Sequence, residues 1–149
     1  MKLLFSSLLI LSIVTFQSIA YSAKPVYSGG RDRAAIRGYD PVAYFVENAP
    51  VKGSKEIQLV HNGATWFFSS EENRALFKSD PEKYSPQFGG YCAYAISQNT
   101  TASIKPQYFK IHNGKLYLNY SKAVYKRWLK DTDNLIEEAE QNWPSVLEK

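Results

Sequence analysis

Two Asn-Gly pairs, each placed between short alternating apolar stretches, constrain the fold of this chain more than any other feature. Both residues of such a pair accept a positive φ, so each favours the tight type I′ turn of a β-hairpin. The alternation of apolar and polar side chains predicts that each hairpin buries one face. The pairs are Asn62-Gly63, between residues 57–60 and 64–68, and Asn113-Gly114, between residues 108–111 and 116–118.

Helix-start signals lie between and after the two hairpins. Ser69 and Glu72 have the spacing of a capping box. Further helix starts are indicated by Asp80-Pro81, Ser121 and Asp131, and we expect Pro144 to end the last helix. The predicted fold class is therefore α+β: a small antiparallel sheet from the two Asn-Gly hairpins, with several short helices packed on it.

The first 20 residues have the pattern of an export signal. Lys2 gives a positive start, residues 3–16 are mostly apolar, and Ser18-Ile19-Ala20 supplies the small residues of a cleavage site. The alternative is a membrane anchor, but the apolar run is shorter than the roughly 18 to 20 residues that a spanning helix needs. We expect cleavage near Ala20 to Ala23, a periplasmic or secreted protein, and no membrane span afterwards.

Cleavage there would leave about 125 residues, which is enough for one domain. The predicted organisation is a flexible lead-in at 21–33, a domain at 34–144 and a C-terminal tail at 145–149. Without Lys2 the net charge falls from +4 to about +3, and the cations are scattered along the chain. Nucleic-acid binding needs a dense basic patch, so we expect no nucleic-acid partner.

The only cysteine, Cys92, follows Gly89-Gly90-Tyr91 and precedes a stretch, 93–98, that can start a helix. Glycine permits a positive φ and a close backbone approach. In the first turn of a helix, free N–H groups and the helix dipole stabilise a thiolate and lower its pKa. Cysteine is also one of the most buried residue types, so a packed, inert thiol is the alternative. A single cysteine excludes an internal disulfide.

Several segments resemble the YHS domain: Asp40-Pro41-Val42, the run from Trp66 to Phe77, and Asp80-Pro81-Glu82-Lys83-Tyr84. The resemblance extends over about residues 34–144 to exported YHS domain-containing proteins, which share Gly-Gly-Tyr-Cys-Ala and the Asn-Gly-Ala-Thr-Trp turn. Some members of that family have selenocysteine at the position of Cys92. The resemblance therefore implies a YHS-like fold and a redox or soft-metal role for this position, without a defined activity.

The chain departs from the metal-binding members that it resembles. YHS modules of metal transporters resemble Asp-Pro-Val-Cys followed by Phe-Cys-Ser-x-x-Cys, and their cysteine positions are Ala43, Ser69 and Asn73 here. The remaining soft ligands, Cys92, His61 and His112, show no ligand spacing. We therefore assign no metal ligands and expect that folding requires no cofactor; the identity of any cofactor stays open.

Three functional hypotheses follow, and the sequence leaves open whether the protein is an enzyme. The first is a redox or soft-metal protein that works through Cys92 as a catalytic thiol. The second is a binding module with an aromatic pocket for a small ligand, and the third is a structural or interaction domain. The expected partner is a small molecule, a metal ion or a thiol. The candidate pocket residues are Asp40, Trp66, Gly89, Gly90, Tyr91 and Tyr94.

Overall fold

The computed structural model describes residues 23–148, so the predicted signal peptide at 1–20 lies outside the described part. Within that part no helix has the length and apolarity that crossing a membrane requires. The elements in chain order are the 3₁₀ turn η1 (Ile36–Gly38), α1 (Ala43–Val46), β1 (Ser54–His61), β2 (Ala64–Phe68), α2 (Glu71–Ser79), α3 (Pro81–Tyr84), η2 (Gln87–Gly90), α4 (Ala93–Ser97), β3 (Phe109–His112), β4 (Lys115–Leu118), α5 (Lys122–Trp128) and α6 (Thr132–Val146).

Both hairpins form as the Asn-Gly pairs predict. β1 pairs antiparallel with β2, and β3 with β4. The four turn residues all have a positive φ, from 48° at Asn62 to 73° at Gly114. The α+β class is confirmed, although the hairpins are two separate two-stranded sheets instead of one.

Irregular segments pair with edge strands of both hairpins, at edges through which the hairpins could otherwise have joined into one sheet. The N–H of Ala35 donates to the carbonyl of Thr65 on β2 at 2.8 Å. Cys92 makes a parallel bridge to Leu118 on β4. These contacts satisfy backbone groups on both hairpins, so neither hairpin has to pair with the other.

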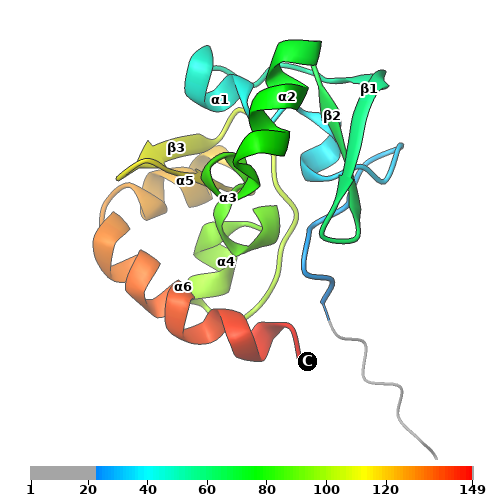
Figure 1. The fold of residues 1–149 in the computed structure, drawn as a ribbon. Coiled ribbons are helices and arrows are strands. Elements are labelled where there is room, and N and C mark those ends of the chain that lie inside the picture. The colour runs from blue at the N-terminus through cyan, green and yellow to red at the C-terminus, as the bar shows by residue number, and fades with distance from the viewer. Residues whose placement is uncertain (1–22, 149) are drawn as a thin grey trace, which may run out of the picture.

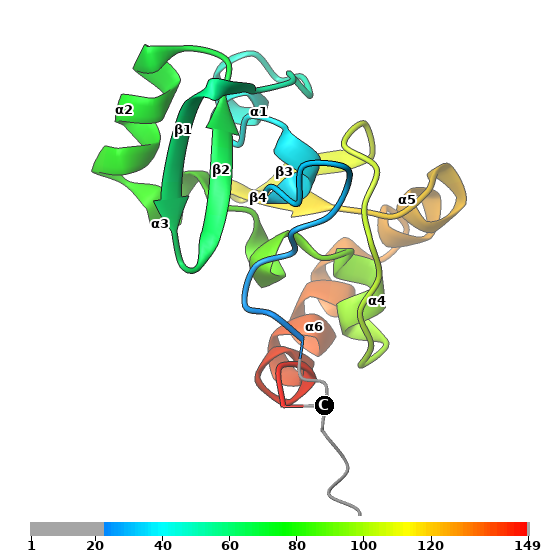
Figure 2. The ribbon, with the colours of Figure 1, turned by 90° about the vertical axis from the view of Figure 1, so that its right-hand side faces the viewer.

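Two hydrophobic clusters hold the elements together. In the larger, Trp66, Phe68 and Phe77 pack between the first hairpin and α2, and Leu116 and Leu118 join them from β4. In the smaller, Tyr117 of β4 packs with residues of α4, α5 and α6, among them Trp128 and Ala139. Figures 1 and 2 show the β1–β2 hairpin with α2 at one end of the molecule and α6 at the other. Because alternate residues of β4 face the two clusters, this strand connects both halves.

The start of the described chain packs against the domain, although the sequence predicts a lead-in there. Val26 is buried, and the N–H of Tyr27 donates to the carbonyl of Gly89 at 2.8 Å. Gly89 has a φ of 60°, and a Cβ at this position would lie 2.0 Å from the carbonyl oxygen of Pro25. Glycine is therefore required at this position for the close backbone approach that the sequence indicates.

Two helix ends differ from the prediction. Ser70 caps α2 and accepts from the N–H of Asn73, whereas Ser69 is engaged elsewhere. α6 continues through Pro144 to Val146. Pro144 lies in the last turn, where the loss of one N–H removes a single hydrogen bond, and the buried Val146 anchors that turn. The predicted caps Asp80 and Ser121 are confirmed.

Candidate functional site

Cys92 is the N-cap residue of α4, at the position expected for it, but its side chain is only 1% exposed. Its sulfur lies 3.7 Å from Oδ1 of Asn119, and the backbone N–H groups of Ala95, Tyr120 and Tyr94 face it. Burial raises the pKa of the Cys92 thiol, because the opposing hydrogen bonds do not compensate for the lost hydration. The lowered pKa predicted from the sequence is therefore wrong.

The surroundings of the sulfur do not fit a resident metal ion. Its polar neighbours are one amide oxygen and three N–H donors, and donors cannot ligate a cation. Across residues 23–148 no group of three or more His, Cys, Asp or Glu side chains comes together. Cys92 is therefore not assigned as a metal ligand.

Asp40 is fully buried and accepts five hydrogen bonds. Oδ1 accepts from the N–H groups of Val42 at 2.8 Å and Ala43 at 3.3 Å. Oδ2 accepts from the N–H of Ser69 at 2.8 Å, its hydroxyl at 2.7 Å and the Asn73 amide at 2.8 Å. The carboxylate thus joins the start of α1 to the start of α2, and its lone pairs are fully used.

Ala43, Ser69 and Asn73, the positions at which the resemblance to metal-transporter modules implies cysteines, gather around this carboxylate. All three donate to Asp40. The side chains at these positions are a methyl group, a hydroxyl and an amide; the Ala43 backbone N–H, the Ser69 hydroxyl and the Asn73 amide donate to the carboxylate, and this set does not fit a soft metal ion. In this chain the network is a structural link between two helices.

The six candidate pocket residues do not form one pocket. Trp66 is 1% exposed and belongs to the larger core. Both carboxylate oxygens of the buried Asp40 already accept hydrogen bonds from the protein. Gly89 lies against Pro25 of the N-terminal segment, whereas Gly90 lies against Ile36 and Pro86. Tyr94 packs against both cores, whereas Tyr91 lines a cleft of about 710 Å³ together with Tyr27 and the polar residues 99–101.

A second cleft, of about 670 Å³, collects cations from four separate segments; we call it the basic cleft. Its charged lining is Arg31, Arg37, Lys52 and Lys105, with Asp32 as the one carboxylate. Asp32 is already paired with Lys55 at 2.6 Å, and Lys55 is not among the lining residues. The cleft is therefore strongly cationic, with Tyr39 and Tyr120 as aromatic walls.

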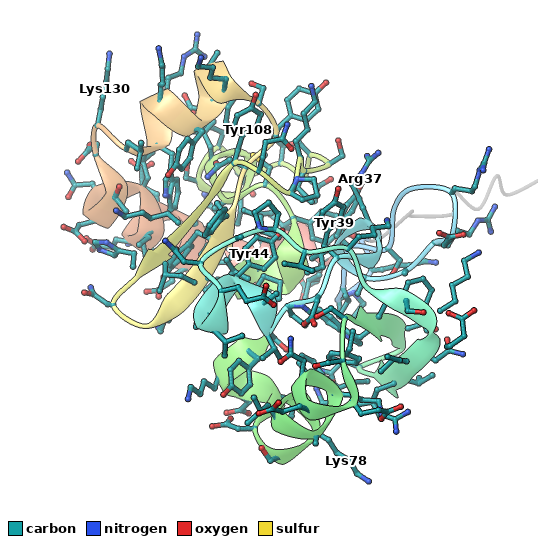
Figure 3. All side chains as sticks on the ribbon, turned by 90° about the horizontal axis from the view of Figure 1, so that it is seen from above. Arg37, Tyr39, Tyr44, Lys78, Tyr108 and Lys130 are labelled. Atoms are coloured by element: carbon teal, nitrogen blue, oxygen red, sulfur yellow. The ribbon has the colours of Figure 1, made fainter. Side chains whose placement is uncertain are left out.

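A left-handed turn shapes one wall of the basic cleft. Ile36, Arg37 and Gly38 have φ values of 42°, 63° and 75°. A positive φ at a buried β-branched residue such as Ile36 is a real outlier, and such strain tends to accompany functional sites. Lys52 Nζ donates to the carbonyl of Arg37 at 2.6 Å and lies 4.9 Å from the centre of the Tyr39 ring. Figure 3 shows Arg37 and Tyr39 side by side.

Comparison with known families identifies one segment of the chain. The family model of the YHS domain matches residues 42–88. This segment is a YHS domain. It contains most of the Asp40 network and ends four residues before Cys92. No curated protein and no solved structure matches the chain.

The basic cleft lies almost entirely outside the YHS segment. Of its charged residues only Lys52 falls within residues 42–88, while the others come from the N-terminal turn and the 103–107 loop. The sequence interpretation missed this cleft because its cations are far apart along the chain. The positive φ of Ile36 also has no local sequence signal, because β-branched residues usually avoid it.

Proposed function

We propose that this protein is an exported, YHS-containing binding module that holds a small anionic molecule in the basic cleft. The observation that supports it is the convergence of Arg31, Arg37, Lys52 and Lys105 on one concave surface. Ligand sites are commonly concave, with aromatic walls and a few convergent polar groups, and Tyr39 and Tyr120 supply such walls here.

The cleft cations are only partly compensated: Asp32, which lies in the lining and is paired with Lys55, also interacts electrostatically with Lys52 and Arg31. Neither Arg31, Arg37 nor Lys105 forms an ion pair within the described chain, and Lys52 donates to a backbone carbonyl. Like charges held together repel one another, and an anionic ligand would remove that repulsion. A guanidinium also matches the planar geometry of carboxylate and phosphate groups, which makes Arg37 the main expected contact.

Calorimetric titration with inorganic pyrophosphate and with citrate tests this proposal. We expect binding that weakens with salt, and a loss of about tenfold or more in Arg37→Gln, since a charged hydrogen bond contributes about 1.5 to 3 kcal/mol. Lys78→Gln, an exposed cation on α2 away from the cleft, is the matched control. Heats that are absent for both anions, or equal losses in the two variants, would contradict the anion site.

A thiol function at Cys92 is the second proposal, favoured by one observation. The N–H groups of Ala95, Tyr120 and Tyr94 surround the sulfur and would stabilise a thiolate once it becomes exposed. Iodoacetamide labelling of the folded protein against pH, with Cys92→Ser as the blank, separates the two proposals. A thiol function requires rapid labelling of the folded protein near neutral pH; labelling only on unfolding, which the burial of the sulfur favours, would remove this second proposal.

Export is tested independently of either site. The proposal rests on the residue pattern of positions 1–20. Mass spectrometry of the periplasmic or secreted fraction should find an N-terminus between residues 21 and 24. An intact Met1 in the membrane pellet would remove the export proposal and leave the cleft proposal standing.

A further inference from the structure

Charge is divided between two parts of the chain. Residues 83–130 contain eight lysines and arginines and no aspartate or glutamate. The helix that follows, α6 (Thr132–Val146), has four carboxylates and no lysine or arginine. The low net charge therefore hides a strongly cationic part next to an anionic one.

The cations of α5 lie on its exposed side. Lys122 and Lys126 lie four residues apart on the helix, and Lys130 follows in the turn after it; all three are exposed. Residues four apart share a face of a helix. Arg127 is exposed beside them, while Trp128 is fully buried on the opposite side. We call the residues Lys122, Lys126, Arg127, Leu129 and Lys130 the α5 face.

Several cations of the α5 face repel one another. Lys122 and Lys126 lie four residues apart, and Lys122 in the first turn opposes the helix dipole, whereas Lys126 and Arg127 in the last turn favour it. None of its four cations forms an ion pair within residues 23–148. An anionic surface laid against this face would convert that repulsion into attraction.

We propose that the α5 face docks on the surface of an anionic lipid bilayer. Leu129, 44% exposed, lies among the cations, and Tyr120, 47% exposed, precedes the helix at the edge of the basic cleft, which it also lines. An exposed leucine and tyrosine beside lysines are the side chains that favour the interface, where lysine stems and aromatic rings contact the lipid while charges reach the headgroups. Neither the basic cleft nor the cleft beside Tyr91 is lined by any residue of the α5 face.

Vesicle co-sedimentation of the purified chain tests this proposal. We expect binding to phosphatidylcholine vesicles that contain phosphatidylglycerol, little binding to pure phosphatidylcholine, and release by salt. Each cation near an anionic surface strengthens partitioning about fivefold, so Lys126→Gln with Lys130→Gln should weaken binding about 25-fold. The matched control, Lys78→Gln with Lys83→Gln, has the same net charge; Figure 3 places Lys78 and Lys130 at opposite edges of the molecule.

Other outcomes assign the result to a different source. Equal losses in both double variants, or no binding to either vesicle, would overturn the proposal. Binding to soluble polyglutamate without binding to anionic vesicles would also overturn it and indicate an acidic protein partner. Leu129→Ser should weaken vesicle binding without changing charge, and Arg37→Gln should preserve it, since Arg37 belongs to the basic cleft and not to the α5 face.

Discussion

At the scale of single residues, two buried polar groups have opposite roles. Asp40 accepts hydrogen bonds from three residues besides its own neighbour Val42 and joins two helices. The Cys92 sulfur meets mainly backbone groups, and burial raises its pKa. The first group links two helices through its hydrogen bonds, whereas burial favours the neutral form of the second.

Asp40→Asn should destabilise the protein by about 3 kcal/mol, because an amide keeps the shape but turns one acceptor into a donor facing buried donors. Urea unfolding monitored by tryptophan fluorescence measures the change. Asp80→Asn is the control: Asp80 caps α3 at an exposed position, and asparagine caps equally well. A similar small loss in both variants would show that the Asp40 network contributes little.

Stability should decline as pH rises above about 8.5, the usual pKa of a free thiol. Above that pH the unfolded chain loses the Cys92 proton while the folded chain, with its raised pKa, retains it, so unfolding becomes more favourable. The decline has a limit of about 1.4 kcal/mol per pH unit for one group. Cys92→Ser should abolish the decline below pH about 10, where tyrosines begin to ionise.

Burial also raises the pKa of Tyr117 to about 12, so a further decline in stability is expected between the two tyrosine pKa values, about 10 unfolded and about 12 folded. Tyr44, whose pKa burial raises as well, adds to the same loss. Unfolding free energies of Cys92→Ser that still fall between pH 8.5 and 10 would contradict the assignment of the first decline to Cys92.

At the scale of elements, glycines with a positive φ have two different uses. Nothing lies within 4 Å of a Cβ built on Gly63, whereas one built on Gly89 would lie 2.0 Å from the carbonyl oxygen of Pro25. The first glycine serves only the turn of the β1–β2 hairpin. The second also allows the N-terminal segment to pack closely against η2, because glycine has no Cβ.

Gly63→Ala should therefore lower the free energy of unfolding by about 1 kcal/mol, because a residue with a side chain is strained in the left-handed conformation. Gly89→Ala should lower the free energy of unfolding by more, because the added Cβ also displaces the segment that contains Pro25 and Tyr27. Thermal melts of the two variants give the order, and hydrogen exchange at the Tyr27 amide should rise in Gly89→Ala alone. Equal losses without a change in exchange would contradict the packing role of Gly89.

Local signals in the sequence predicted local structure well. Asn62-Gly63 and Asn113-Gly114 identified both turns, because their chemistry alone permits the required φ. The cap of α2 was misplaced by one residue, since adjacent serines 69 and 70 are equivalent caps until a distant Asp40 engages one of them. The basic cleft is formed by segments that are distant from one another in the sequence, so no short motif predicts it.

At the scale of the whole molecule, two hydrophobic clusters stabilise the fold, and β4 contributes to both. Ala43, Ser69 and Asn73, where the resemblance to metal-transporter modules implies cysteines, all donate hydrogen bonds to Asp40. Thermal melts with and without EDTA should therefore coincide. A fall in melting temperature on chelation would mean that a metal contributes folding free energy.

The burial of Cys92 also makes its oxidation state depend on the order of events during folding. A chain that folds before it meets an oxidant encloses a reduced sulfur, which then cannot cross-link to another chain because only 1% of the residue is exposed. A chain oxidised first carries extra atoms on a sulfur that the fold buries beside Asn119, so folding must enclose those atoms in a site closed to solvent. Disulfide-linked dimers on a non-reducing gel would thus report the fraction of molecules that were oxidised before they folded.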